Sequence, residues 1–291
     1  MPRRPATPEA SISRTTVPAE VNHTTLQPTI DLTMGVYGRD LGHVADDVAR
    51  VLDELPTRAE REPVVGAGEG GDETTAIDAA AERAILPHFA GMRIVSEEVG
   101  STGEGELLAV VDPIDGSLNA KRGIPFFSIS IAIADGGTMD DVRFGYVHDF
   151  GTGEEWTAER GGGAFLNGEP LVERPKDELE ILSFEATTLA YVTERAAQFT
   201  GVAHRLRLMG SLAISLCHLA AGRVDGVVSL KPARSVDIAA GQLLVRERGF
   251  AIELPDDPPF GAAPLDLEGR SRVAAAGNEA LCARLAGALR A

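Results

Sequence analysis

The feature that most constrains the fold is a change in the spacing of apolar segments near residue 178. From residue 93 to residue 171, short β-branched and aromatic runs such as "SISIAIA" at 128–134 alternate with Gly and Asp turns. Such runs predict an antiparallel sheet, and Asn167-Gly168 is a strong hairpin signal. After the polar stretch 173–180, strands alternate with helices expected near 191–199, 211–221 and 237–248. The sequence therefore predicts an α+β protein.

Two helices are expected before this sheet. Apolar residues recur at three to five residue spacing over 31–55, and "AIDAAAERAILPHF" at 76–89 favours a second helix that Pro87 stops. The segment "GAGEGGDETT" between them is expected to be a loop. We therefore predict a flexible N-terminal extension over 1–30, an α+β domain over 31–178 and a C-terminal α/β domain over 179–291.

Composition and charge exclude several classes of protein. The 291 residues are 44% hydrophobic, enough for a large core, yet no apolar run approaches the ~20 residues that cross a bilayer. A net charge of −17 argues against nucleic acid or an anionic membrane as a partner. No secretion signal is visible, and Cys217 and Cys282 are too few for a disulfide framework. A cytoplasmic protein is expected.

The segment "VVDPIDGSLNA" carries the strongest chemical signal. An apolar strand runs into Asp112 and Asp115 and then into Gly116, Ser117 and an expected helix start. Carboxylates at a strand end can hold hard cations, and the free N–H groups that follow can bind an anion such as phosphate. An acidic turn that caps a helix gives the same letters, so this motif alone leaves both interpretations open.

Further acidic segments favour a metal site. Glu97 and Glu98 follow the strand "RIV", Asp78 ends "DETTAID", and Asp237 begins a helix in "SVDIAAG". If these residues converge with Asp112 and Asp115, charges 4 Å apart would repel one another by roughly 4 kcal/mol at an effective dielectric of 20. Two or three Mg²⁺ ions would remove this repulsion and would also prevent the carboxylates from repelling a phosphate. None of the six histidines has metal-binding spacing.

Together these segments resemble the inositol monophosphatase family. "DPIDGSLN", the upstream "SEE" and "GGDETTAID", and the downstream "GGGAFLNG" and "VDIAAG" occur in the expected order. The family shares its fold with fructose-1,6-bisphosphatases in a superfamily of Mg²⁺-dependent, lithium-sensitive phosphatases. The resemblance implies a layered αβαβα fold, with an antiparallel sheet, a second mixed sheet and flanking helices. It also implies Mg²⁺ dependence and often a homodimer.

The resemblance also implies roles for individual residues. The metal ligands would be Glu97, Asp112, the carbonyl of Ile114, Asp115 and Asp237, with Asp112 bridging. Asp78 and Ser117, with Thr75 nearby, would polarise the water held by the metals. The N–H groups of Gly116 and Ser117 would hold phosphate oxygens, and Gly210 and Ser211 would lie near substrate hydroxyls. An ordinary helix cap explains Gly210 and Ser211 nearly as well.

Three positions depart from the family pattern. Ser117 replaces the usual Thr but keeps the hydroxyl, and Val236 replaces a common Trp. Leu230 stands where animal inositol monophosphatases have a glutamate that contacts inositol. "GGDETTAID" and "LKPARSVDIAAG" look closer to archaeal-type enzymes that accept both inositol phosphate and fructose 1,6-bisphosphate. Lys231 or Arg234 could then meet a second phosphate, unless they form a solvated basic loop.

The predicted activity is Mg²⁺-dependent hydrolysis of a phosphate monoester of a small polyol or sugar. Inositol 1-phosphate and fructose 1,6-bisphosphate are the expected substrates. One alternative is a phosphatase of the same family that acts on 3′-phosphoadenosine 5′-phosphate. Another is a catalytically silent binding or regulatory protein on the same fold. A haloacid-dehalogenase phosphatase is excluded, because Asp112 and Asp115 do not form its D-x-D motif.

Overall fold

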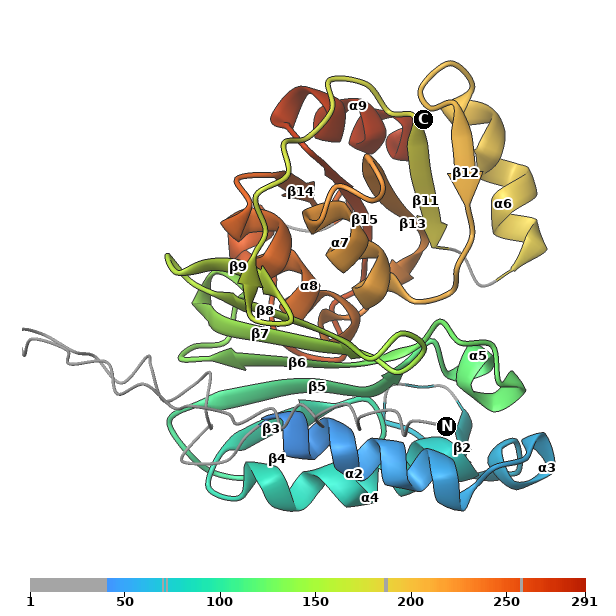
Figure 1. Ribbon diagram of the computed structural model, residues 1–291, viewed down its shortest axis with the longest axis vertical. Helices are drawn as coiled ribbons and strands as arrows, with labels where there is room; N and C mark the ends of the chain where they lie inside the picture. Colours follow the sequence, from blue (N-terminus) through green and yellow to red (C-terminus); the bar gives the residue numbers. More distant parts are fainter. Residues whose placement is uncertain (1–40, 70, 72, 186–187, 257–258) are drawn as a thin grey trace, which may run out of the picture.

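A large, mainly antiparallel sheet forms the first half of the protein (Figure 1). The computed structural model describes residues 41–291 except 70, 72, 186–187 and 257–258. The strand order is β10-β9-β8-β7-β6-β5-β3-β4. The bounds are β3 Arg93–Ser96, β4 Gly100–Thr102, β5 Leu108–Asp115, β6 Ser128–Ala134, β7 Val142–Asp149, β8 Glu154–Glu159, β9 Gly163–Leu166 and β10 Glu169–Pro170.

A second, five-stranded sheet follows the connection at 171–180. Its order is β12-β11-β13-β15-β14, with parallel pairing of β11 to both β12 and β13 and antiparallel pairing of β15. The bounds are β11 Ile181–Glu185, β12 Arg205–Arg207, β13 Gly226–Ala233, β14 Ala251–Glu253 and β15 Ser271–Ala276. This is the second, mixed sheet that the family resemblance implies.

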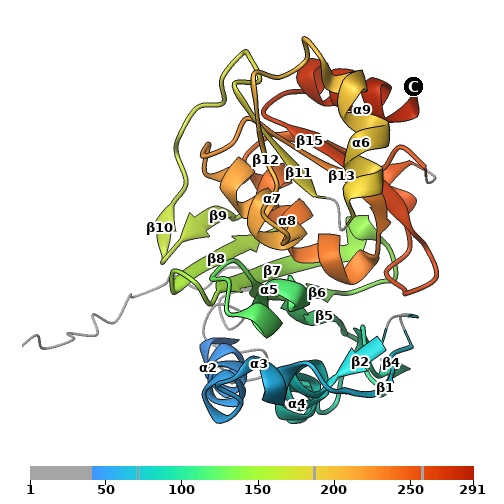
Figure 2. The same ribbon diagram turned by 90° about the vertical axis from the view of Figure 1, so that its right-hand side faces the viewer.

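Helices fill the remaining layers. The α-helices are α2 Leu41–Glu54, α3 Arg58–Arg61, α4 Ala76–Ile85, α5 Ser117–Arg122, α6 Leu189–Arg195, α7 Leu212–Ala220, α8 Ser235–Glu247 and α9 Glu279–Arg290. Short 3-10 helices cover Leu86–Phe89, Met139–Asp141, Ala196–Phe199 and Phe260–Ala262. Helices α2 and α4 cover the outer face of the large sheet, α7 and α8 lie between the sheets, and α6 and α9 lie beyond the second sheet (Figures 1 and 2). This arrangement confirms the expected αβαβα fold.

Three apolar cores hold these layers together. One lies between α2, α4 and the large sheet, the second surrounds α7 and α8, and the third joins the second sheet to α9. The buried stripe of α2 includes Val44 and Val48, as its apolar spacing predicts. Helix α8 is buried almost all round and packs on β5 to β9, so a C-terminal helix completes the core of the N-terminal sheet.

The structure differs from the sequence-based expectations in two places. The segment 66–75 is not wholly a loop, because Val64–Ala67 (β1) and Glu73–Thr75 (β2) pair as antiparallel strands. The large sheet also contains one parallel pair, β3 with β5. The reason is topological: β4 pairs with β3 at the sheet edge, and the chain then crosses back to start β5 on the other side of β3. The predicted extension at 1–30 lies outside the described residues.

Within the described part of the chain, no helix combines the length and apolar composition needed to span a membrane.

Candidate active site

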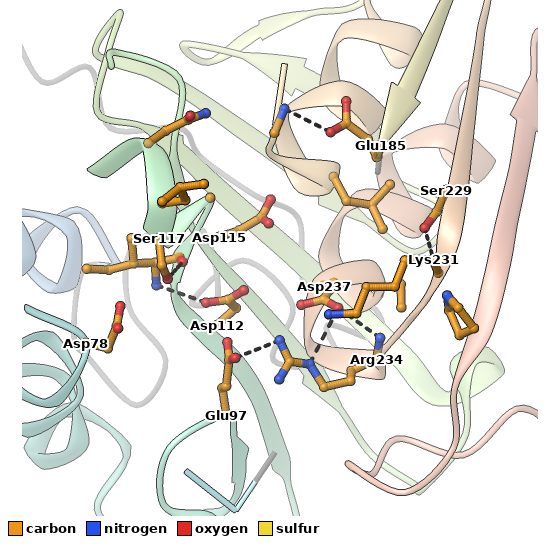
Figure 3. A pocket seen from close by; sticks show the side chains of 18 of the residues that line it. Asp78, Glu97, Asp112, Asp115, Ser117, Glu185, Ser229, Lys231, Arg234 and Asp237 are labelled. Carbon is orange, nitrogen blue, oxygen red and sulfur yellow. Dashed lines mark hydrogen bonds and ion pairs between the residues drawn. The ribbon is translucent and has the colours of Figure 1, made fainter. Parts of the chain in front are cut away.

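A cavity of about 340 Å³ opens where the two sheets approach each other (Figure 3). Its walls come from both halves of the chain. Eight of its lining residues are acidic and four are basic: Glu73, Asp78, Glu97, Glu98, Asp112, Asp115, Glu185 and Asp237, with Lys121, Lys231, Arg234 and Arg270. The predicted carboxylates therefore converge in one cavity.

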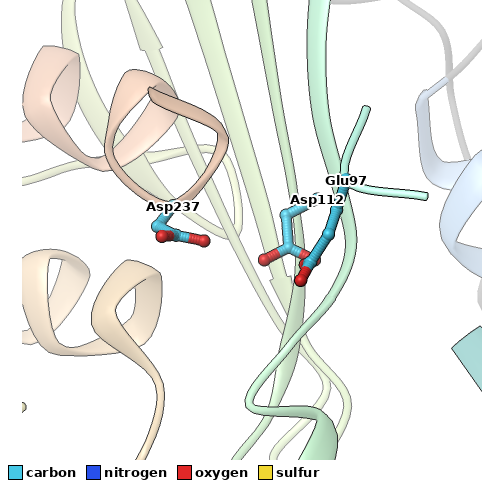
Figure 4. Close-up of side chains that lie close together, drawn as sticks. All are labelled: Glu97, Asp112 and Asp237. Atoms are coloured by element: carbon cyan, nitrogen blue, oxygen red, sulfur yellow. The ribbon is translucent and has the colours of Figure 1, made fainter. Parts of the chain in front are cut away.

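Three of these carboxylates form the centre of the cavity. Glu97, Asp112 and Asp237 each offer an oxygen within 4.8 Å of the others. Figure 4 shows Glu97 and Asp112 side by side on neighbouring segments of the large sheet, with Asp237 facing them from α8. Three oxygen donors at this spacing match the ligands that Mg²⁺ prefers.

Local structure explains how these side chains reach the same point. Glu97 directly follows β3 and Asp112 lies near the end of β5, and these parallel strands end at the same edge. Asp237 lies in the first turn of α8, where it accepts a hydrogen bond from the backbone N–H of Arg234 at 2.8 Å. A carboxylate at a helix N-terminus is stabilised by the helix dipole.

A bulge lets one strand present two carboxylates to the cavity. Residues three apart on a regular strand point to opposite faces. The register of β5 shifts between Asp112 and Asp115, and both residues line the cavity. Asp115 Oδ2 accepts hydrogen bonds from Ser211 Oγ at 2.6 Å and from the N–H of Ala213 at 2.7 Å. Ser211, predicted to contact substrate, is buried, caps α7 and contacts Asp115.

The electrostatics of the centre favour bound cations. Burial, and then the charges of Glu97, Asp115 and Asp237, raise the pKa of Asp112 well above its usual range. Burial raises the pKa of Glu97 to about 8, with Arg234 acting against the shift, and burial and Asp237 raise that of Asp115 to about 7. Divalent cations would relieve this repulsion while keeping the carboxylates charged, so the residues fit a Mg²⁺ site.

Asp78 lies on the wall of the cavity and is held there by Thr75. Thr75 caps α4, and its hydroxyl and N–H both donate to Asp78 Oδ2. Lys121 Nζ lies 3.3 Å from the same oxygen. Asp78 Oδ1 is buried, and none of the described residues gives it a hydrogen bond. This oxygen is therefore the free acceptor of the pair.

The turn after β5 supplies backbone groups to the cavity. Gly116 and Ser117 begin α5 and line the cavity, and the first N–H groups of a helix have no partner within it. Ser117 Oγ donates to the carbonyl oxygen of Ile114 at 2.9 Å. That carbonyl, predicted as a metal ligand, therefore lies beside the predicted catalytic hydroxyl.

Gly116→Ala is expected to lower the free energy of unfolding by about 1–3 kcal/mol, because Gly116 has φ +92°. A Cβ there would lie 2.9 Å from the carbonyl oxygen of Gly210. Gly123→Ala is the matched control, since Gly123 has φ +70° and open space around it. Urea denaturation should show the larger loss for Gly116→Ala. Equal losses would mean that the contact with Gly210 contributes nothing.

The residues near β13 differ in their access to the cavity. Lys231, a predicted substrate contact, lines the cavity, whereas Leu230 is buried in the core of the second sheet. Arg234 is nearly buried, and its guanidinium lies 2.6 Å from Glu97 Oε1 and 3.6 Å from Asp237 Oδ2. Arg234 thus faces the central carboxylates in this structure and is not part of a solvated loop.

Two residues of the cavity, Glu185 and Lys121, are not among those predicted from the sequence. Glu185, at the end of β11, lines the cavity and accepts a hydrogen bond from the N–H of Gly210 at 3.0 Å. Burial raises the pKa of Glu185 to about 7. An acidic residue at the end of an apolar strand was the available signal for Glu185. For Lys121, the signal was its place one turn after Ser117 on a helix that starts at the motif.

Comparison with known proteins agrees with this geometry. Residues 40–291 match the model of the inositol monophosphatase family. A curated relative, the fructose-1,6-bisphosphatase/inositol-1-monophosphatase of Archaeoglobus fulgidus, is 33% identical over 247 residues, which cover 83% of this chain and 93% of the relative.

Two solved structures share the fold. A hypothetical protein from Pyrococcus horikoshii with similarities to inositol-1 monophosphatase aligns with a TM-score of 0.72 at 28% identity, over 85% of this chain and 97% of that one. An inositol monophosphatase-fructose 1,6 bisphosphatase aligns with a TM-score of 0.75 at 25% identity, over the same shares of the two chains. The layered arrangement is therefore common to this chain and both structures.

Proposed function

The chain belongs to the inositol monophosphatase family, and we propose that it hydrolyses the phosphate monoester of a small polyol or sugar with the help of Mg²⁺. The observation that carries this proposal is the convergence of Glu97, Asp112 and Asp237 on one point. A catalytically silent relative would be expected to have lost a ligand carboxylate, and this chain retains every predicted one.

The metal ligands in this proposal are Glu97, Asp112, Asp115, Asp237 and the carbonyl oxygen of Ile114. Two or three Mg²⁺ ions, when bound, neutralise the phosphate, lower the pKa of the attacking water and stabilise the departing alkoxide. The protein supplies buried oxygen donors held at fixed positions by a strand bulge and a helix start.

The remaining groups orient the reaction. The free Oδ1 of Asp78 accepts a proton from the attacking water, while Thr75 holds the other carboxylate oxygen in place. Ser117 would orient the same water through its hydroxyl group. The N–H groups of Gly116 and Ser117 hold the phosphate oxygens in line with the attack. Gly210 contributes to the wall near the substrate hydroxyls.

Among possible substrates, we favour a sugar bisphosphate such as fructose 1,6-bisphosphate. Lys231 and Arg270 line the cavity and offer positive charge to a second phosphate. The position expected to carry an inositol-contacting glutamate is Leu230, which points into the core. Inositol 1-phosphate is the second expected substrate. Homodimer formation and a cytoplasmic location, both expected from the sequence, remain part of the proposal.

A substrate panel tests the proposal directly. Phosphate release should depend on Mg²⁺ and should be measured with fructose 1,6-bisphosphate, inositol 1-phosphate and 3′-phosphoadenosine 5′-phosphate. Fastest turnover of the sugar bisphosphate supports the assignment. Fastest turnover of the nucleotide would favour the alternative within the family, and no metal-dependent release from any of them would contradict an enzymatic role.

Lys231→Gln should separate the two expected substrates. Loss of a charge-assisted contact should lower kcat/KM for fructose 1,6-bisphosphate about 10- to 100-fold, while inositol 1-phosphate, which has a single phosphate, should be little affected. Lys231→Arg is the control that keeps the charge. Equal losses with both substrates would place Lys231 at the reacting phosphate and contradict this assignment.

A further inference from the structure

We propose that Lys121 is a fixed cation of the active site and takes the position of a third metal ion beside Asp78. This enzyme therefore binds two divalent ions and not three. The inference rests on the proposed function and makes its metal requirement specific. The supporting observations concern the residues around Asp78 and not those around Asp112.

The contact between Lys121 and Asp78 is enclosed by protein. Nζ lies 3.3 Å from Asp78 Oδ2, and the two side chains are 17% and 7% exposed. Ion pairs at this depth are screened by solvent much less than surface pairs. Glu98 lines the same cavity. The ammonium group of Lys121 therefore lies in a part of the site with two carboxylates, Asp78 and Glu98, that do not belong to the central cluster.

The helix that carries Lys121 is anchored on both sides of it. The carbonyl oxygen of Ala120 accepts a hydrogen bond from Arg61 Nη1 at 2.7 Å. Arg122 Nε lies 2.6 Å from Glu62 Oε1, on the side of α5 that faces α3. Helix α5 contains only six residues, and these contacts fix its last turn. Lys121 is therefore directed toward Asp78 while its neighbour Arg122 is directed away.

This arrangement has a consequence for metal binding. Asp78 already has a positive charge on its Oδ2 side, and its Oδ1 remains free to accept a proton. A divalent ion in the same corner would lie next to the ammonium group and be repelled by it. Asp78 does not belong to the group formed by Glu97, Asp112 and Asp237, and these three carboxylates can still hold two ions together with Asp115.

The test is a count of bound Mn²⁺, which replaces Mg²⁺ as a probe that electron paramagnetic resonance can detect. The full-length wild-type protein is expected to bind two ions and Lys121→Met to bind a third, weaker one. Lys121→Arg should bind two, because it keeps the charge. Arg122→Met is the matched control for loss of a neighbouring cation and should also bind two. Circular dichroism and thermal unfolding establish that each variant is folded.

Phosphate release gives a second readout. At low Mg²⁺ the rate of Lys121→Met should fall about 10- to 100-fold, and high Mg²⁺ should restore it because the added ion supplies the lost charge. A purely structural role of Lys121 would not give this rescue. Three ions in an active wild-type protein, or two in folded Lys121→Met, would overturn the inference and leave the proposed function intact. A wild-type protein that binds no Mn²⁺ and releases no phosphate would instead overturn the proposed function.

Discussion

Asp112→Asn is expected to lower Mg²⁺-dependent phosphate release by at least about 100-fold and, at pH 8, to raise the thermal stability of the metal-free protein. The loss of activity follows from removing the central ligand, since even partners outside the metal's immediate ligands contribute about 10- to 100-fold. The gain in stability follows because burial, and then the charges of Glu97, Asp115 and Asp237, raise the pKa of Asp112, so that its charged form is unfavourable in the folded protein. An amide removes that charge, and each kcal/mol gained shifts Tm by about 2–4 °C.

The two effects can be measured on the same preparations. Phosphate release is assayed with saturating Mg²⁺, and Tm is recorded with EDTA. Asp149→Asn is the matched control: Asp149 is also buried but does not line the cavity, and it accepts a hydrogen bond from the N–H of Gly151 at 2.7 Å. This control should lose stability and keep its catalytic rate. An Asp112→Asn protein with full activity would refute the assignment of the metal centre.

The metal-free protein should also lose stability as pH rises from about 4.5 to 8. Burial raises the pKa of Glu97 to about 8 and the pKa values of Asp115 and Glu185 to about 7. Between the unfolded and folded pKa values, the folded protein binds more protons than the unfolded chain. The resulting stabilisation is complete below about pH 4 and is lost as pH rises through 7 and 8. A total loss of at least about 3 kcal/mol is expected.

Urea denaturation at several pH values, with EDTA or with Mg²⁺, measures this effect. Mg²⁺ should remove the part of the pH dependence that comes from Glu97 and Asp115. The part from Glu185, which is not a proposed ligand, should remain and should disappear in Glu185→Gln. A metal-free protein whose stability is constant or rises over this range would show that folding does not raise the pKa values of these carboxylates.

Much of the fold and the central carboxylates could be predicted from the sequence. The spacing of apolar residues predicts α2, which buries one face, and the apolar segments after residue 210 predict α7 and α8, which are buried almost all round. The order of "SEE", "DPIDGS" and "VDIAAG" predicts that Glu97, Asp112 and Asp237 meet, and they do. These predictions succeed because one local pattern both forms the element and places the acidic side chain at its end.

The ionic partners could not be predicted in the same way. Arg234 lies in a basic stretch that resembles a surface loop, and only the approach of α8 to β3 brings it to Glu97. Lys121 meets Asp78 because α5 packs near the start of α4, which the sequence does not reveal. The pairing of β1 with β2 was missed because glycine-rich strands have weak propensity. Each of these features depends on contacts between segments distant in sequence.

The place of Asp237 has a consequence for synthesis of the protein. Asp112 and Glu97 belong to the first half of the chain, whereas Asp237 enters from α8, which also completes the core of the large sheet. A ribosome-bound chain that ends before α8 would lack both a ligand and part of that core. Hydrolytic competence should therefore appear only after most of the polypeptide has been translated, and two separately expressed fragments divided within 171–180 should be inactive alone and active when they reassemble.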